Sequence, residues 1–195
     1  MRILVINPNS SENMTDHLRE VLNRIKRSDT ELEVVSIPSA PQTIESAYDE
    51  ALAIPPTLDR VKRANEEGYE AIILACFSDP GLTAAKEISK IPVIGIAEAT
   101  LHMASMLGAK FSILTTRKER IASKREYVFL KGLEHFLASV RSLDLSVDET
   151  DSDSQKTKMR IFEETEKAIS NDGAEVIILG CAGMAGYNAE IESEL

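Results

Sequence analysis

The sequence is poor in cysteine, has no tryptophan and contains no long apolar run. Its 195 residues include two cysteines, too few for a disulfide framework. No stretch reaches the ~18–20 apolar residues that a transmembrane helix needs. The opening segment MRILVINPNS lacks the charged, apolar and cleavage regions of a signal peptide. These absences favour a cytoplasmic protein with reduced thiols and no membrane partner.

Positive charge is also scarce. The chain has 22 Lys and Arg against 32 Asp and Glu, which gives a formal net charge of −10. A nucleic-acid partner would need a basic patch, so we expect none. The three histidines, His17, His102 and His135, do not have the paired spacing of a metal site, so we expect no metal.

Strand-like and helix-like segments alternate along the chain. Several of the strand candidates are nearly continuous runs of Val and Ile, as in parallel strands covered on both faces. The expected strands are Arg2–Ile6, Glu31–Ile37, Tyr69–Ala75, Pro92–Ile96, Lys110–Thr115, Val140–Val147 and Ala174–Gly180. The pattern predicts an α/β fold.

Helical spacing fills the longer segments between these strands. One helix is expected to bury Met14, Leu18, Val21, Leu22 and Ile25, and another Met159, Ile161, Phe162 and Ile169. The acidic run at 148–156 is expected to be a solvated loop ahead of the second helix.

The order of elements repeats after about 105 residues, the separation of Cys76 and Cys181, which is too long a period for a solenoid. We therefore expect two similar three-layer α/β/α domains, Rossmann-like with mostly parallel sheets, related by pseudo-two-fold symmetry. Residues 1–98 would form the first domain and 99–195 the second. A strand and a helix follow the cysteine motif in the first half, so we expect the second domain to lack a C-terminal strand and helix.

Both cysteines occupy the same point of the same local pattern. AIILACFSDPGL (71–82) and EVIILGCAGMAG (175–186) are apolar runs that reach a cysteine and then turn-forming residues. Ligands bind at the carboxyl ends of strands in open α/β sheets, and backbone N–H groups at a helix start favour a thiolate. A single free cysteine is usually an apolar core residue.

Two cysteines in matching positions favour a chemical role. If they flank one cleft, a thiolate removes a proton from a carbon while the other thiol protonates the opposite face, which inverts the stereocentre without metal or organic cofactor. A redox pair is the competing use, but the sequence has no Cys-x-x-Cys.

Other polar residues follow the expected strands. Asn7 and Asn9 follow the first strand, and Thr115 and Thr116 hold the matching place in the second half; turn formation and capping are the alternatives for both. Asp79 would disfavour a nearby thiolate, so we expect it to point elsewhere or to orient a donor. Backbone N–H groups are expected to stabilise enolate-like charge at Phe77, Ser78, Ala182 and Gly183.

Three motifs together resemble the aspartate/glutamate/hydantoin racemase superfamily, most closely its hydantoin and allantoin racemase branch. They are INPNSS (6–11), ACFSDPGL (75–82) and GCAGM (180–184), in the right order and over essentially the whole chain. The resemblance implies two α/β domains, racemisation without cofactor, and Cys76 and Cys181 as the acid/base pair. It also implies substrate contacts at the Asn and Thr pairs. Related decarboxylases keep only one of the two cysteines.

The expected function is therefore a racemase acting beside a carbonyl, on 5-substituted hydantoins or allantoin. We expect a homo-oligomer that acts on a small molecule. An aspartate or glutamate racemase is the nearest alternative, but few basic residues lie near the motifs, Arg117 being the nearest. A non-catalytic ligand-binding module on the same fold is the second alternative.

Overall fold

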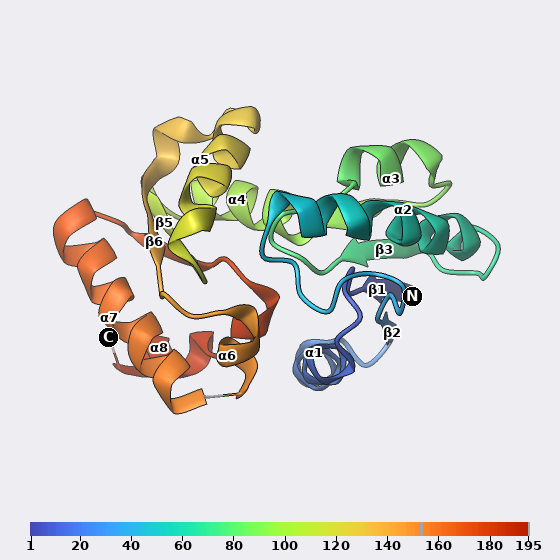
Figure 1. Ribbon diagram of the computed structural model, residues 1–195, viewed down its shortest axis with the longest axis horizontal. Coiled ribbons are helices and arrows are strands. Elements are labelled where there is room, and N and C mark those ends of the chain that lie inside the picture. Colours follow the sequence, from blue (N-terminus) through green and yellow to red (C-terminus); the bar gives the residue numbers. More distant parts are fainter. Residues whose placement is uncertain (153, 195) are drawn as a thin grey trace. The chain divides into compact units, whose positions relative to one another are not determined.

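The computed structural model describes residues 1–152 and 154–194, which divide into two compact units, Met1–Ile96 and Ala97–Leu195 (Figure 1). The first unit contains β1 (Arg2–Ile6), α1 (Glu12–Ile25), β2 (Glu31–Val35), α2 (Ala47–Ala64), β3 (Ala71–Leu74), α3 (Leu82–Ile88) and β4 (Val93–Gly95). The division falls where β4 passes directly into α4 (Ile96–Leu107). The remaining elements are β5 (Phe111–Thr115), η1 (Lys118–Arg120), α5 (Ile121–Leu130), η2 (Glu134–Phe136), β6 (Leu137–Ser142), α6 (Val147–Ser152), α7 (Ser154–Asp172), β7 (Val176–Leu179), η3 (Ala182–Met184) and α8 (Asn188–Glu194).

The first unit is built on a four-stranded sheet in the order β2-β1-β3-β4. All of its strand pairs are parallel, and Ile6 at the end of β1 pairs with Val35 on one side and Leu74 on the other. Parallel neighbours need crossover connections, which α1, α2 and α3 provide. The carboxyl ends of β1 and β3 therefore lie side by side.

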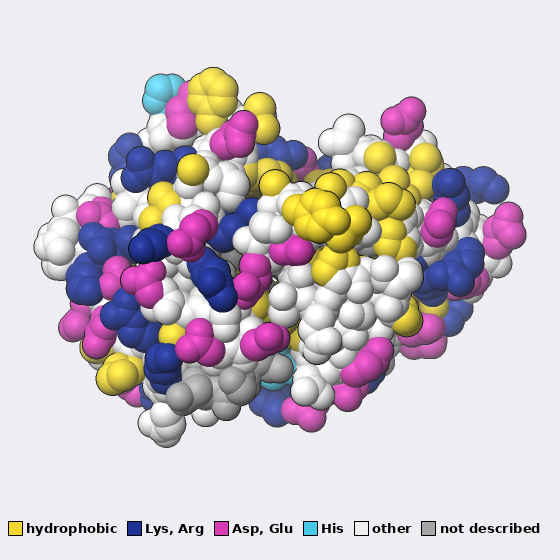
Figure 2. All heavy atoms as spheres, in the orientation of Figure 1, with side chains coloured by type: hydrophobic (Ala, Val, Ile, Leu, Met, Phe, Trp, Pro, Cys, Tyr) yellow, Lys and Arg dark blue, Asp and Glu magenta, His cyan; other side chains and the backbone are white. Residues whose placement is uncertain are grey.

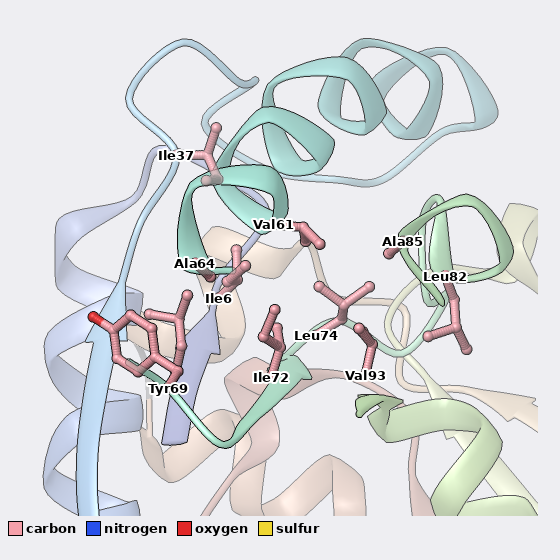
Figure 3. Close-up of a cluster of buried hydrophobic side chains, with 11 residues drawn as sticks. Ile6, Ile37, Val61, Ala64, Tyr69, Ile72, Leu74, Leu82, Ala85 and Val93 are labelled. Carbon is pink, nitrogen blue, oxygen red and sulfur yellow. The ribbon is translucent and has the colours of Figure 1, made fainter. Parts of the chain in front are cut away.

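Helices α2 and α3 cover one face of this sheet (Figure 3). Alternate strand residues point to that face, as the pleat of a strand requires. The buried cluster that results consists of Leu4, Ile6, Ile37, Val61, Ala64, Tyr69, Ile72, Leu74, Leu82, Ala85 and Val93. Helix α1 packs against β2 and buries Met14 and Leu18.

The second unit repeats this topology with a three-stranded parallel sheet in the order β6-β5-β7. Its strands β5, β6 and β7 correspond to β1, β2 and β3, and among the described residues β4 has no counterpart. Residues from the strand ends, α7, η3 and α8 form one buried cluster of Leu114, Leu143, Leu145, Ile161, Met184 and Ile191. The expected α/β fold with parallel sheets is confirmed in both units.

One expected strand, Val140–Val147, is wrong in its position. The strand β6 runs from Leu137 to Ser142, because Asp144 has a φ of +53°, which an extended strand does not allow. The apolar residues Leu143 and Leu145 lie beyond the strand and are fully buried in the core of the second unit.

The expected loop at 148–156 is also wrong where the structure describes it. Helix α6 begins after Ser146, whose hydroxyl accepts a bond from the Glu149 N–H (3.1 Å) while the Glu149 carboxylate accepts one from the Ser146 N–H (2.8 Å). This reciprocal capping box starts the helix. The hydrogen bonds from Ser146, with a contribution from Lys156, lower the pKa of Glu149 to about 2. Residues 154–156 belong to α7, and residue 153 lies outside the described residues.

The expected buried faces of two helices are partly wrong. Ile25 at the end of α1 is exposed, and so are Met159 and Ile169 on α7. The buried face of α7 instead carries Thr157, Ile161, Glu164, Thr165 and Ala168. Ile161 is buried as expected and Phe162 packs against the same cluster, so on this helix the prediction fails only for Met159 and Ile169.

The face of the molecule drawn in Figure 2 carries interspersed basic and acidic side chains. Apolar side chains gather over α2, which exposes Tyr48 and Leu52 (Figure 2). Within the described part of the chain, no helix is both long and apolar enough to cross a membrane.

Candidate active site

The first unit brings Asn7, Asn9 and Cys76 to neighbouring strand ends. Strands β1 and β3 pair directly, and the Ala75 N–H donates to the Ile6 carbonyl (2.8 Å) just before both chains leave the sheet. The residues that follow therefore emerge at the same edge. This is the edge at which α/β sheets bind ligands.

The loop after β1 is held by buried hydrogen bonds. Its backbone is tied to the segment after β2, because the Ile37 N–H donates to the Asn9 carbonyl (2.8 Å) and the Ser10 N–H to the Pro41 carbonyl (3.0 Å). The side chains of Asn7 and Asn9 are both buried. Asn7 Nδ2 donates to Asn9 Oδ1 at 2.8 Å.

Cys76 opens a tight turn between β3 and α3. It is half-buried and forms no disulfide, and its Sγ lies 3.4 Å from Ser78 Oγ. The Asp79 N–H donates to the Cys76 carbonyl (2.9 Å), and Asp79 itself is buried with a φ of +46°. Phe77 has a buried side chain. The turn thus places a hydroxyl beside the thiol.

The second unit has the same arrangement at the ends of β5 and β7. The Gly180 N–H donates to the Leu114 carbonyl (2.7 Å), as Ala75 does to Ile6 in the first unit. Thr115 and Thr116 follow at the end of β5 and are buried. Cys181, Ala182 and Gly183 follow β7, and Cys181 is the residue immediately before η3.

Cys181, like Cys76, is half-buried and forms no disulfide. It packs against the buried cluster of the second unit, beside the fully buried Met184. Each unit therefore presents one half-buried thiol just after the carboxyl end of a strand, a position from which a thiol could transfer a proton to or from carbon. Among residues 1–152 and 154–194, no His, Cys, Asp or Glu side chains form a group of three able to hold a metal ion.

Sequence reasoning missed the residues that support this site. Thr15 of α1 is fully buried and accepts a hydrogen bond from Asn7 Nδ2 (3.0 Å). Gly95 at the end of β4 leaves the space that the Asp79 side chain occupies. The only signal for Thr15 was its place on the buried face of α1 beside Met14, where an apolar residue is the usual choice.

Comparison with known proteins agrees with this architecture. Residues 3–195 match the family described as Asp/Glu/Hydantoin racemase. The hydantoin racemase of Pseudomonas sp. (strain NS671) is 38% identical over 195 residues, which are all of this chain and 78% of that protein. Two solved allantoin racemases align over the whole chain. The one from Klebsiella pneumoniae has a TM-score of 0.96 at 34% identity, with 79% of it covered, and the one from Pseudomonas fluorescens 0.94 at 31%, with 82% covered.

The fold and these matches identify the protein as an isomerase that contains two α/β units, each with a parallel sheet. The chain belongs to the Asp/Glu/hydantoin racemase family.

Proposed function

We propose that the protein racemises 5-substituted hydantoins or allantoin by acid/base chemistry between two cysteines, with no metal or organic cofactor. Cys76 and Cys181 would face the substrate carbon from opposite sides. One thiolate removes the proton next to the carbonyl, and the other thiol delivers a proton to the opposite face. The roles exchange for the other enantiomer.

The observation that carries this proposal is the equivalence of the two cysteines. Cys76 follows β3 and Cys181 follows β7, and each of these strands pairs with the first strand of its own unit. Both cysteines are half-buried and neither forms a disulfide. A cysteine that only fills space in the core of one unit would not require a cysteine after the equivalent strand of the other unit. The named relatives, which are hydantoin and allantoin racemases, support the same substrate class.

The remaining site residues have assigned roles in this proposal. Removal of the proton leaves negative charge on the carbonyl oxygen, and backbone N–H groups at 77–78 and 182–183 would stabilise it. Asn9, Thr115 and Thr116 would orient the ring through hydrogen bonds. We also expect this chemistry to operate in a reducing compartment such as the cytoplasm, because it requires reduced thiols. We expect the active protein to be a homo-oligomer.

Proton NMR in D₂O tests the proposal by following loss of the substrate α-proton signal. The panel contains both enantiomers of allantoin and of several 5-substituted hydantoins, with aspartate and glutamate as the competing substrate class. We expect exchange with a hydantoin or allantoin. Exchange with aspartate or glutamate alone would favour the amino-acid racemase alternative.

The variants Cys76→Ser and Cys181→Ser separate the roles of the thiols. Each should lower racemisation by about 10²–10⁴-fold, the usual contribution of a positioned acid or base. Each should keep slow α-proton exchange with one enantiomer only, and the two variants should prefer opposite enantiomers. Thermal unfolding checks that both variants fold. A folded double variant that still racemises would rule out the two-cysteine mechanism.

A further inference from the structure

A chain of buried hydrogen bonds runs from α1 to the loop after β1. The Thr15 hydroxyl donates to the Ser11 carbonyl (2.7 Å) and accepts from Asn7 Nδ2 (3.0 Å). Asn7 Nδ2 also donates to Asn9 Oδ1 (2.8 Å), which accepts a second bond from the Ser11 N–H (3.0 Å). Thr15 and Asn7 are 0% and 1% exposed, so neither side chain reaches the surface.

The backbone N–H of Ser11 fixes the orientation of both amides. It can only donate, so the atom of Asn9 that it contacts must be the oxygen. The Asn9 oxygen needs a donor from Asn7, so Nδ2 of Asn7 faces Asn9. That orientation leaves Asn7 Oδ1 buried without a hydrogen-bond partner. A buried unpartnered acceptor is costly, and its retention calls for an explanation.

The explanation lies in what this orientation does to Asn9. Its oxygen is used by two donors, so its Nδ2 is the group left for a ligand. Asn9 Nδ2 donates to the thioether sulfur of Met14 at 3.3 Å, a weak acceptor that uses only one of the two N–H groups. The hydrogen bonds thus hold the Asn9 amide with its oxygen toward Asn7 and Ser11 and its Nδ2 on the other side, in a residue that is 5% exposed.

We propose that Thr15 and Asn7 are positioning residues that lock the Asn9 side chain so that its Nδ2 donates to a carbonyl oxygen of the substrate. This inference rests on the proposed function. It gives Asn7 a different role from direct substrate contact. Asn7 acts through Asn9, and Thr15 acts through Asn7.

Steady-state racemisation of the best hydantoin or allantoin by Thr15→Val tests the proposal. This substitution keeps the shape of the side chain and removes the hydroxyl. We expect kcat/KM to fall about five- to tenfold, the effect of losing one well-placed hydrogen bond. Thr15→Ser keeps the hydroxyl and should retain at least about half of the wild-type value. Asn7→Ala removes the donor directly and should match Thr15→Val.

The matched control is Thr57→Val, because Thr57 is also fully buried in the first unit and its hydroxyl has no hydrogen-bond partner. This control should leave kcat/KM unchanged. A double-mutant cycle gives the decisive readout: Thr15→Val should have no further effect once Asn9→Ala is present, because Thr15 acts only through Asn9.

Two results would overturn the inference while the proposed function survives. In the first, the wild type is active and Thr15→Val has the same kcat/KM. In the second, Thr15→Val lowers kcat/KM equally in the wild type and in the Asn9→Ala background. If Thr15→Val does not fold, Asn7→Ala is tested by the same cycle. A folded wild type that is inactive on every hydantoin and on allantoin would overturn the proposed function and this inference together.

Discussion

The carboxylate of Asp79 occupies the space in which a Cβ would stand if residue 95 were not glycine. Gly95 ends β4, and Asp79 lies in the turn that follows Cys76. Asp79 adopts a φ of +46°, in the left-handed region that Asp enters more readily than most residues other than glycine. The shape of the loop that carries Cys76 therefore depends on the absence of a side chain on a neighbouring strand.

We expect Gly95→Ala to destabilise the protein by about 1–3 kcal/mol, because the added methyl group must displace the Asp79 carboxylate. Urea unfolding measures this cost. The same substitution should cost less in an Asp79→Gly background, where the overlap is gone. An equal cost in both backgrounds would show that Asp79 is not the group displaced.

Ser78 should control the reactivity of Cys76. Its hydroxyl lies 3.4 Å from the Cys76 sulfur, and a hydrogen bond to a thiolate stabilises the charged form. Ser78→Ala should therefore slow alkylation of Cys76 by iodoacetamide at pH 7 by about three- to tenfold. Ser78→Thr, which keeps the hydroxyl, should react like the wild type.

Peptide mass spectrometry measures the alkylation of each cysteine separately. The rate of Cys76 is compared with that of Cys181 in the same sample, and the ratio should fall in Ser78→Ala because Ser78 Oγ lies beside Cys76 Sγ. Unchanged alkylation of Cys76 in Ser78→Ala would contradict the role given to this hydroxyl.

Much of the fold could be predicted because buried parallel strands have a strong local signal. Runs such as 3–6 and 71–74 are short and apolar on both faces, as strands covered on both sides of a parallel sheet require. The same signal places Asn9 and Cys76 just after the ends of two strands. The observed sheet order then shows that these strands, β1 and β3, are neighbours. The role of the two cysteines stays a prediction.

The features that were missed depend on single interactions or on tertiary contacts. Helix α6 begins with a capping box of Ser146 and Glu149, a pattern that can be read in a sequence but was masked by the surrounding acidic residues. The end of β6 depends on the backbone conformation of Asp144. Thr15 is buried and its hydroxyl accepts a hydrogen bond from Asn7, a tertiary partner that no local pattern reveals.

Gly180, directly before Cys181, should tolerate no side chain. A Cβ at this position would lie 2.7 Å from the Leu114 carbonyl oxygen and 2.8 Å from Cγ2 of Ile113. Both contacts involve a packed strand, so Gly180→Ala should lower the free energy of unfolding by about 1–3 kcal/mol and disturb Cys181.

Ala75 holds the equivalent position in the first unit, where the methyl group is accommodated. Ala75→Gly should cost only about 1 kcal/mol in the same urea experiment; a smaller loss for Gly180→Ala than for Ala75→Gly would contradict this account.

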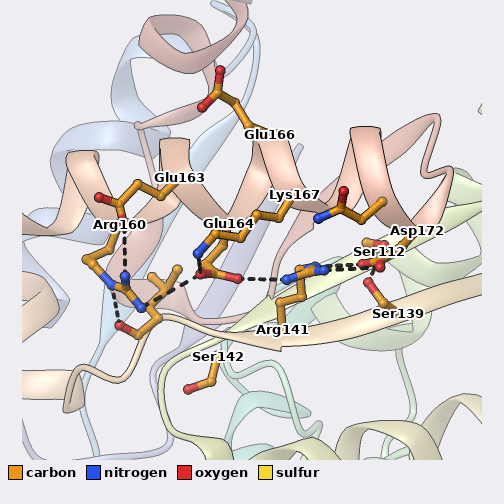
Figure 4. Close-up of polar contacts among 12 residues, drawn as sticks. Ser112, Ser139, Arg141, Ser142, Arg160, Glu163, Glu164, Glu166, Lys167 and Asp172 are labelled. Carbon is orange, nitrogen blue, oxygen red and sulfur yellow. Dashed lines mark hydrogen bonds and ion pairs between the residues drawn. The ribbon is translucent and has the colours of Figure 1, made fainter.

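Arg141 links the edge strand β6 to α7 (Figure 4). Its guanidinium donates to both carboxylate oxygens of Asp172 (2.6 and 3.0 Å) and to Glu164 (3.1 Å). The hydrogen bonds from Arg141 lower the pKa of Asp172 against the opposing effect of burial. Burial acts to raise the pKa of Glu164, but hydrogen bonds from Lys167 and Arg141 outweigh it and lower the pKa.

This network should make the stability of the protein depend on acid pH. A carboxyl group with a lowered folded pKa stabilises fully above its unfolded pKa, about 3.9 for Asp and 4.3 for Glu. The stabilisation is lost as pH falls through the lower folded value. Arg141→Met should thus cost about 1–3 kcal/mol at pH 7, and the cost should shrink below about pH 4. Urea unfolding between pH 7 and pH 3 measures how this loss of unfolding free energy changes with pH.

Arg24→Met, which removes an exposed charge, should cost less than about 0.5 kcal/mol throughout. An Arg141→Met cost that stays constant with pH would mean that these carboxylates do not depend on Arg141.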